Sequence, residues 1–313
     1  MARDPEGQCC QGRDIECSLV AGQARSPRRE LERVAAVVRL VRRSDWLGVP
    51  AVLLVLGMFA WPVVSFLAKS VTDPHVGLQN FVSVATDSVY AKVLLNTVVI
   101  SATTTIFTLL LGYPVAYTIA RASGRRRRLM IFVVLIPFWT SLLVRTFSWM
   151  ILLQPHGVIN SLLLASGLIE HPLELIFNRT GLFIAMVQMQ LPFLIFPLFN
   201  VLSKIDDAYM RASANLGASP FTTFWRVYFP LSMPGIVAGS MLVFVTSLGY
   251  FVTPALLGGL RDMMVAQLID EQVADIGTWG VPAALSVILL CGTAMIFLII
   301  KRATGATRKG ARR

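Results

Sequence analysis

Six long stretches of apolar residues constrain this chain more than any other feature of its sequence. They cover about residues 47–68, 93–120, 129–153, 181–202, 231–257 and 279–300. A helix needs about 20 consecutive, mostly apolar residues to cross the hydrocarbon core of a bilayer. Charged residues make up only 14% of the chain, whereas a soluble domain has about a quarter. The sequence therefore predicts an all-α membrane protein with six transmembrane helices.

The basic residues predict how these spans are oriented. Of the 28 Lys and Arg residues, 23 lie before residue 45, within 121–128, within 204–226 or after residue 300. Loops rich in Lys and Arg stay on the cytoplasmic side, so we expect both termini and the loop 203–230 to be cytoplasmic. The net charge of +11 is then explained by topology rather than by nucleic-acid binding, because no soluble basic domain remains to hold nucleic acid.

Two terminal regions flank the predicted transmembrane domain, which covers residues 45–302. Residues 1–44 have little hydrophobic periodicity and are expected to be largely disordered and cytoplasmic. Within them, LERVAAVVRLVRR is either an amphipathic helix on the inner leaflet or only a basic flank of the first span. Cys9, Cys10 and Cys17 lack the paired spacing of a zinc site, so we predict no metal site. Residues 303–313 are a basic cytoplasmic tail.

The chain lacks the motifs of several function classes. It has no G-x-x-x-x-G-K-[ST] loop for nucleotide phosphates. No Asp or Glu lies within a predicted span, so the carboxylate relay of a proton-driven pump is missing. No reactive pair of side chains within the spans indicates an enzyme. A permease powered by another subunit remains, with a stand-alone channel as the alternative.

Residues 203–230, called the elbow from here on, form a polar segment between two apolar spans. Asp206 or Asp207 is expected to cap a short helix that runs to about Asn215. Gly217 follows where the end of a helix favours a left-handed residue. The elbow is therefore predicted to begin with a short, capped helix and a tight turn.

A second helix is predicted to follow this turn. Ser219 is suited to the N-cap position and Pro220 to the first helical position. Pro230 is expected to end this helix where the chain re-enters the bilayer. A helix, a glycine turn and a second helix make a rigid knob, which is the shape of a docking element.

The segment IDDAYMRASANLGASPFTTFWRVYFPLSMPGI resembles the EAA loop of permeases from bacterial ABC importers. The triplet 211–213 takes the E-A-A positions, Gly217 matches the glycine of the pattern, and the pairs 229–230 or 231–234 match its ending. Arg211 and Ser213 depart from the pattern, which affects any salt bridge of the usual Glu. The resemblance implies that the loop inserts into a groove of a cytoplasmic ATPase. Its coupling residues would be Arg211, Ala212, Ser213, Leu216, Gly217, Ala218, Ser219 and Pro220.

The passages LLGYPVAYTIAR, IPFWTSLLVRTFSWMILL, GYFVTPALLGG and VAQLIDEQV resemble the spermidine/putrescine branch of these permeases. The resemblance covers about residues 46–300. It implies half of a pore in the bacterial inner membrane, surrounded by lipid. It further implies a second permease subunit, two ATP-binding subunits that hold ATP and Mg, and a periplasmic binding protein. The chain itself would bind no cofactor. Opines, 4-aminobutyrate and ferric iron are the alternative substrates of related permeases.

Several polar and aromatic residues within the spans are candidates for the translocation path, because they flank prolines that can open a helix. They are Phe138, Trp139, Thr140, Ser141, Arg145, Gln188, Gln190, Tyr250 and Thr253. Helix–helix packing is the alternative role for each of them. Arg145 is the one charge within a span, and we expect either a gate or subunit-interface ion pair or an anchor that reaches outward to the bilayer surface.

The segment VINSLLLASGLI, residues 158–169, is too short to span a bilayer. It is predicted to lie as a helix at the outer interface. In an importer, that surface would receive the binding protein.

Overall fold

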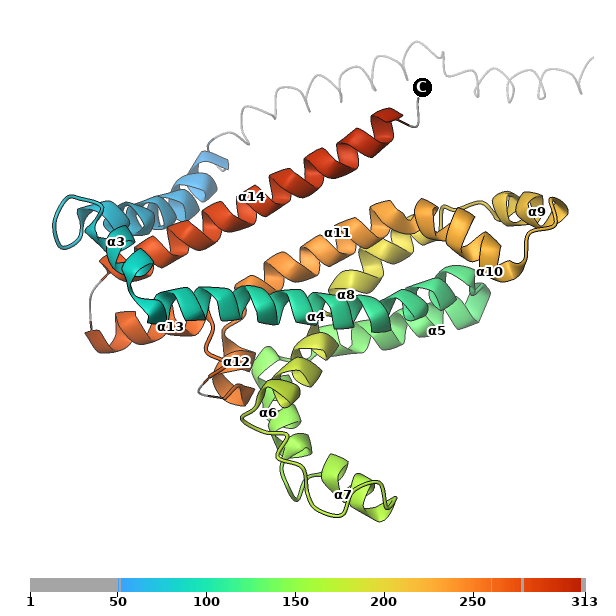
Figure 1. Ribbon diagram of the computed structural model, residues 1–313, viewed down its shortest axis with the longest axis horizontal. Coiled ribbons are helices and arrows are strands. Elements are labelled where there is room, and N and C mark those ends of the chain that lie inside the picture. Colours follow the sequence, from blue (N-terminus) through green and yellow to red (C-terminus); the bar gives the residue numbers. More distant parts are fainter. Residues whose placement is uncertain (1–49, 51, 260, 277–278, 311–313) are drawn as a thin grey trace, which may run out of the picture. The chain divides into compact units, whose positions relative to one another are not determined.

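The computed structural model describes residue 50 and residues 52–310, except residues 260, 277 and 278. It comprises two units that meet between Ser65 and Phe66, and every labelled element belongs to the second unit. Six described segments are helical, long and apolar enough to cross a membrane, which confirms the predicted class (Figure 1). They are Val52–Thr72, Ser88–Arg121, Leu142–Ala165, Arg179–Leu202, Pro220–Leu248 and Gly280–Ile300. The predictions for residues 1–44 lie outside the described residues.

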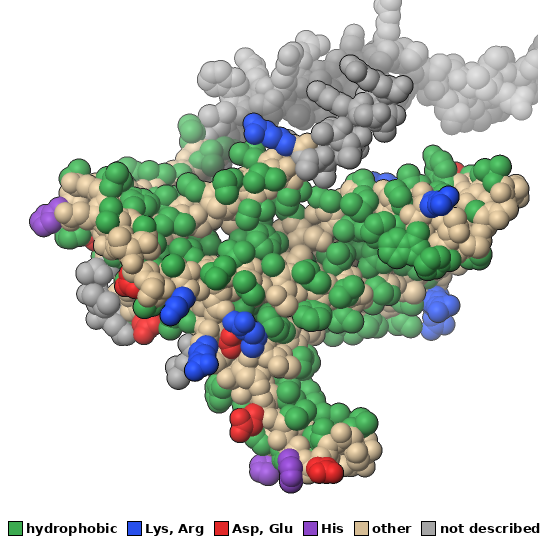
Figure 2. All heavy atoms as spheres, in the orientation of Figure 1, with side chains coloured by type: hydrophobic (Ala, Val, Ile, Leu, Met, Phe, Trp, Pro, Cys, Tyr) green, Lys and Arg blue, Asp and Glu red, His purple; other side chains and the backbone are tan. Residues whose placement is uncertain are grey.

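Three helices form the packed centre of the second unit: α4 (Ser88–Arg121), α8 (Arg179–Leu202) and α11 (Phe229–Leu248). Glycines allow them to approach closely. A Cβ on Gly239 of α11 would lie 3.0 Å from the backbone oxygen of Leu194 on α8, and one on Gly112 of α4 would lie 2.6 Å from the Leu194 side chain. Small residues at such contacts are typical of helices packed within membranes. The faces turned away from this centre are apolar, and hydrophobic side chains cover much of the view in Figure 2.

The segment predicted as a single span over 129–153 is divided into two helices. The first is α5 (Gly124–Leu135), then comes a 3₁₀ turn, η1 (Ile136–Trp139), and after Thr140 and Ser141 the second helix, α6 (Leu142–Leu153). Pro137 explains the division, because it lacks an amide hydrogen and its ring crowds the preceding turn. Residues 136–141 are called the break from here on.

The helix α7 (Val158–Ala165) follows α6 after a turn at residues 154–157. By hydropathy alone, α6 and α7 together make one apolar segment. We assign the membrane crossing to α5, the break and α6 instead, because the turn before α7 contains Pro155 and His156 and α7 has only eight residues. Within the second unit, α6 packs against α8 and α12 (Val252–Leu257), and α7 follows it on the side away from α4 (Figure 1).

The prediction that Pro230 ends the second elbow helix is wrong. Helix α10 (Pro220–Thr223) continues through a π turn, η2 (Phe224–Tyr228), directly into α11. The amide of Phe229 bonds to the carbonyl of Phe224, five residues earlier, which widens the helix just before Pro230. The wider turn accommodates the proline ring that would clash with a carbonyl in a regular helix. The helix ends instead at Gly249, before α12 (Val252–Leu257).

Shorter elements join the far ends of the long helices, opposite the elbow along α4. Helix α3 (Gln79–Thr86) precedes α4, and α13 (Val265–Glu271) and the π turn η3 (Gln272–Ile276) precede α14 (Gly280–Gly310). The amide of Asn80 donates to the carbonyls of Ser70 and Asp73, while the backbone amide of Trp279 donates to the Asp73 carboxylate. These bonds connect Trp279, the residue before α14, to Asp73, and connect Asp73 and Ser70 to α3.

Candidate functional site

The first elbow helix is α9 (Asp207–Asn215), and both of its ends are closed by local hydrogen bonds. The Asp206 carboxylate accepts from the amide of Ala208 at 2.8 Å. At the other end the amide of Gly217 bonds to Ala214 and that of Ala218 to Ser213, at 2.9 and 3.1 Å. This pair of bonds is a Schellman motif, and the φ of +79° at Gly217 gives it the left-handed residue it needs. The predicted cap and glycine turn are confirmed.

The second elbow helix, α10, begins as predicted at Ser219 and Pro220. The Ser219 hydroxyl accepts from the amide of Thr222 at 3.2 Å, as an N-cap residue does. A hydrogen bond of 2.9 Å between the hydroxyls of Ser213 and Thr223 then joins α9 to α10. The elbow is therefore a pair of helices held by a capped turn and a side-chain bond, rather than an open loop.

Aromatic side chains and one arginine connect the elbow to the end of α4. The Arg121 guanidinium pairs with the Asp207 carboxylate at 3.2 Å. Its carbon Cζ also lies 5.5 Å from the ring centroid of Tyr117 and 5.4 Å from that of Tyr228. The exposed ion pair contributes roughly 0–1 kcal/mol, so the aromatic packing is the main connection. Tyr228 is buried and stacks on Phe224 with ring centroids 6.0 Å apart.

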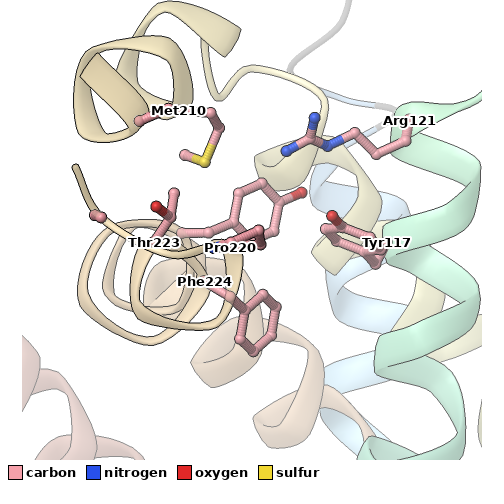
Figure 3. Close-up of a pocket in the computed structure, with 9 residues that line it drawn as sticks. Tyr117, Arg121, Met210, Pro220, Thr223 and Phe224 are labelled. Atoms are coloured by element: carbon pink, nitrogen blue, oxygen red, sulfur yellow. The ribbon is translucent and has the colours of Figure 1, made fainter. Parts of the chain in front are cut away.

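A pocket of about 340 Å³ lies between these elements (Figure 3). Tyr117 and Arg121 line it from α4, Met210 from α9, and Thr223 and Phe224 from the second half of the elbow. The lining is mostly apolar, with the guanidinium of Arg121 at one side. The pocket marks where the elbow rests on the transmembrane helices.

The outer surface of the elbow is exposed and partly apolar. The side chain of Leu216 is 88% exposed and that of Phe221 is 74% exposed. A Cβ on Gly217 would meet no atom within 4 Å. Among the predicted coupling residues, Ser213 and Ala218 are half-buried and the other six are exposed: Arg211, Ala212, Leu216, Gly217, Ser219 and Pro220. Exposed apolar side chains on a rigid element are typical of a protein interface.

The break places four of the predicted path residues together with Arg145. The Arg145 guanidinium donates to the carbonyls of Pro137 and Thr140 and to the Thr140 hydroxyl. Phe138 packs on Phe193 of α8, with ring centroids 5.2 Å apart. Two further predicted path residues beside them are exposed, and they are Trp139, at 87%, and Ser141.

The other predicted path residues lie elsewhere, in helix contacts. The Gln190 side chain is fully buried and donates to the hydroxyls of Thr246 and Ser247 on α11. Thr253 is also fully buried, and its hydroxyl lies 3.3 Å from the sulfur of Met189. Gln188 accepts from the indole of Trp149 at 3.3 Å. Tyr250 is half-buried against the cluster that contains Met186 and Met264. In this conformation Gln190 and Thr253 hold helices together and do not line an open surface.

Two arginines that the sequence reasoning passed over have structural partners. Arg121 was counted only as part of a basic loop, although Tyr117 lies one turn before it in α4. Arg179 pairs with Asp262 at 2.8 Å and also donates to Asn96, beside a pocket of about 490 Å³. The Asp262 side chain is only 8% exposed. Asp262 is 83 residues from Arg179 in the sequence, so no local sequence pattern predicts this ion pair.

No group of three or more His, Cys, Asp or Glu side chains in the part of the chain that the structure describes could hold a metal ion. The elbow has an exposed, partly apolar surface, and the break has exposed aromatic and hydroxyl groups.

Comparison with known proteins identifies the family of this arrangement. Residues 109–304 match the family described as binding-protein-dependent transport system inner membrane component. The spermidine/putrescine transport system permease protein PotB of Salmonella typhimurium is 35% identical over 223 residues, which cover 71% of this chain and 78% of PotB. PotB of Haemophilus influenzae is 32% identical over 77% of this chain and 85% of its own length. The molybdenum transport system permease protein ModB of Mycobacterium bovis is 28% identical over 81% of this chain and 92% of ModB.

Two solved structures share the fold. One is a bacterial ABC transporter involved in the import of the acidic polysaccharide alginate, with a TM-score of 0.65 at 17% identity over 88% of this chain and 99% of that one. The other is a bacterial alginate ABC transporter in complex with an alginate pentasaccharide-bound periplasmic protein. It gives a TM-score of 0.68 at 16% identity, over 84% of this chain and 95% of that one. At these identities the likeness establishes the fold.

Proposed function

The chain belongs to the family of binding-protein-dependent transport system inner membrane components, and from this membership we propose that it is a permease subunit of an ATP-driven polyamine importer. It is a multi-pass protein of the inner membrane. In the proposed assembly it forms half of the translocation pore. A second permease subunit forms the other half, a periplasmic binding protein delivers the substrate, and two cytoplasmic subunits bind ATP and Mg and hydrolyse the nucleotide.

The geometry of the elbow is the observation that carries this proposal. A segment that transmits force from an ATPase must be rigid and must present a surface to that ATPase. The capped α9, the left-handed turn at Gly217 and the bond between Ser213 and Thr223 provide the rigidity. Leu216 and Phe221 provide an exposed apolar surface. A connecting loop between two spans would need neither property.

The proposed topology places this elbow in the cytoplasm. The elbow itself carries three basic residues, within 204–226. The basic residues 121 and 125–128, at the end of α4 and the start of α5, lie at the same end of the second unit (Figure 1). The positive-inside rule assigns that end to the cytoplasmic side. Both chain termini are then cytoplasmic as well, and α7 lies on the periplasmic side, where the binding protein docks.

The proposed substrate class is the polyamines, spermidine and putrescine. The relatives that are at least 30% identical over two thirds of the chain include permeases named for these two compounds. No Asp or Glu lies within the six helical segments that can cross a membrane. Selection of a polycation by charge therefore belongs to the binding protein, and this subunit offers aromatic rings and hydroxyl groups at the break for the passing amines. A ligand screen on the cognate binding protein distinguishes polyamines from opines, 4-aminobutyrate, ferric iron and molybdate.

Co-purification tests the elbow. We expect the detergent-solubilised chain to retain its co-expressed ATPase subunit, and the variant Leu216→Asp to lose it. A charge at an 88%-exposed position is harmless to the isolated chain but must be desolvated in an apolar groove. Leu168→Asp is the matched control, since Leu168 is 74% exposed near the end of α7, away from the elbow. Equal retention of the ATPase by Leu216→Asp and the parent protein would contradict the docking role.

A further inference from the structure

Arg145 directs its side chain along its own chain to the break, and not outward. Its terminal nitrogen donates to the carbonyls of Pro137 and Thr140, and Nε donates to the Thr140 hydroxyl at 3.3 Å. The Thr140 hydroxyl in turn donates to the Pro137 carbonyl at 2.8 Å. All these acceptors precede α6 in the chain, so the guanidinium points away from the Leu153 end of that helix. One of the two alternatives for Arg145 is an anchor that reaches toward the outer surface, and here the side chain turns away from the Leu153 end, which the proposed topology places outside.

The break creates the need for such a donor. The carbonyl of Ser141 accepts the first bond of α6, from the Arg145 amide, so the carbonyl of Thr140 before it lies outside the helical ladder. The carbonyl of Pro137 accepts from the amide and the hydroxyl of Thr140, and the guanidinium adds a further donor to it. Non-helical backbone at membrane depth is tolerated only where the protein or a water-filled cavity supplies partners for its polar groups. A guanidinium offers five N–H groups in a planar fork and can serve several carbonyls at once.

The charge of Arg145 is compensated by these oxygens. The two ion pairs found among the described residues join Arg121 to Asp207 and Arg179 to Asp262. Neither includes Arg145. Its partners are the two carbonyls and the hydroxyl of the break.

The break fixes the directions of two aromatic side chains. Phe138 is held against Phe193 of α8, while the next residue, Trp139, is 87% exposed. In an uninterrupted helix, successive residues are separated by about 100° and a different set of side chains would face outward. The conformation of residues 136–141 thus decides whether the indole of Trp139 is presented.

We propose that Arg145 is a positioning residue of transport, whose guanidinium clasps the carbonyls of the break and thereby holds Trp139 on the surface that the substrate passes. The role in transport rests on the proposed function, whereas the clasp itself is a property of this chain alone.

Three variants test the clasp in the complete importer, reconstituted in liposomes with its partner subunits and binding protein. Arg145→Met removes the donors of the guanidinium and leaves the bonds from the Thr140 amide and hydroxyl to the Pro137 carbonyl. Arg145→Lys keeps a charge and three donors but loses the planar fork. Arg145→Met combined with Pro137→Ala removes the donors and also restores the amide that allows α5 and α6 to join. Arg128→Met, at an exposed position of α5, is the control for the loss of one arginine.

Spermidine uptake and assembly are measured together. We expect Arg145→Met to lower the maximal uptake rate about tenfold or more, the effect of losing hydrogen bonds to a charged group. The concentration of loaded binding protein that gives half-maximal uptake should not change. Arg145→Lys should be intermediate and Arg128→Met should behave as the parent. The double variant should assemble as well as the parent, because a regular helix satisfies the carbonyls, yet transport as poorly as Arg145→Met. A purely structural role would restore both assembly and uptake in the double variant.

A distance measurement tests the conformation of the break without a transport assay. Spin labels at two exposed positions, Leu129 and Ile151, report the separation of α5 from α6 in the full chain after replacement of its four Cys by Ser. An uninterrupted helix would separate them by about 33 Å. We expect the double variant to reach this value and the parent to differ from it. Parent uptake in Arg145→Met, or the same label distance in parent and double variant, would overturn the clasp. Failure of the parent to import spermidine would contradict the proposed function instead.

Discussion

At Gly217 the backbone has a φ of +79°, and the space where a side chain would project is empty within 4 Å. The glycine is needed for its conformation, because an L-residue with a β-carbon costs roughly 1–2 kcal/mol in the left-handed region. No contact with the described residues explains the lack of a side chain at Gly217. A surface that fits closely into a partner would explain it, in addition to the turn.

Gly217→Asp separates these two reasons when it is compared with Gly167→Asp. Gly167 ends α7 with a φ of +70° and equally empty surroundings, so the conformational cost is the same at both positions. We expect both variants to fold, with losses of stability of about 1 kcal/mol. Only Gly217→Asp should lose the co-purifying ATPase subunit, because only the elbow meets the ATPase. Thermal unfolding and co-purification of the ATPase provide the measurement, and equal retention of the ATPase by both variants would show that Gly217 serves only the turn.

Within single elements, the features that depend only on neighbouring residues were predictable from the sequence. The caps at Asp206 and Ser219 and the turn at Gly217 depend on bonds within a few residues, and they are found as predicted. Pro230 was misread because the π turn that accommodates it has no signal in the sequence. The reach of Arg145 back to the break and the burial of Gln190 depend on side-chain paths and on packing between helices. Periodicity alone does not contain that information.

The contact between α8 and α11 gives an element-scale prediction. Gly239→Leu places a side chain against the backbone of Leu194, where even a Cβ would be 3.0 Å from the carbonyl oxygen. Overpacking of this kind costs about 1–3 kcal/mol. Gly292→Leu, on α14, is the control, because a Cβ there meets nothing within 4 Å. The midpoint of thermal unfolding in detergent should fall for Gly239→Leu alone, and an equal midpoint in both variants would disprove the close approach.

For the whole molecule, the family and the six spans agree with the expectations drawn from composition and from the elbow. In the crossing assigned to α5, the break and α6, Arg145 is the only charged residue after Arg128, and its own chain supplies the partners. Neither the permease fold nor the family distinguishes polyamines from other solutes, since the relatives include a molybdenum transport permease. Selection among these solutes is therefore expected to depend on the binding protein.

Uptake of radiolabelled spermidine into liposomes that contain the complete importer tests whether this chain is a subunit of an ATP-driven polyamine importer. We predict accumulation that requires ATP on the ATPase side of the membrane and the loaded binding protein on the other side. It should stop when ATP is replaced by an analogue that is not hydrolysed, and excess putrescine should compete. Spermidine entry at the same rate without ATP would identify a channel, and ATP-driven uptake of another solute with none of spermidine would contradict the polyamine assignment.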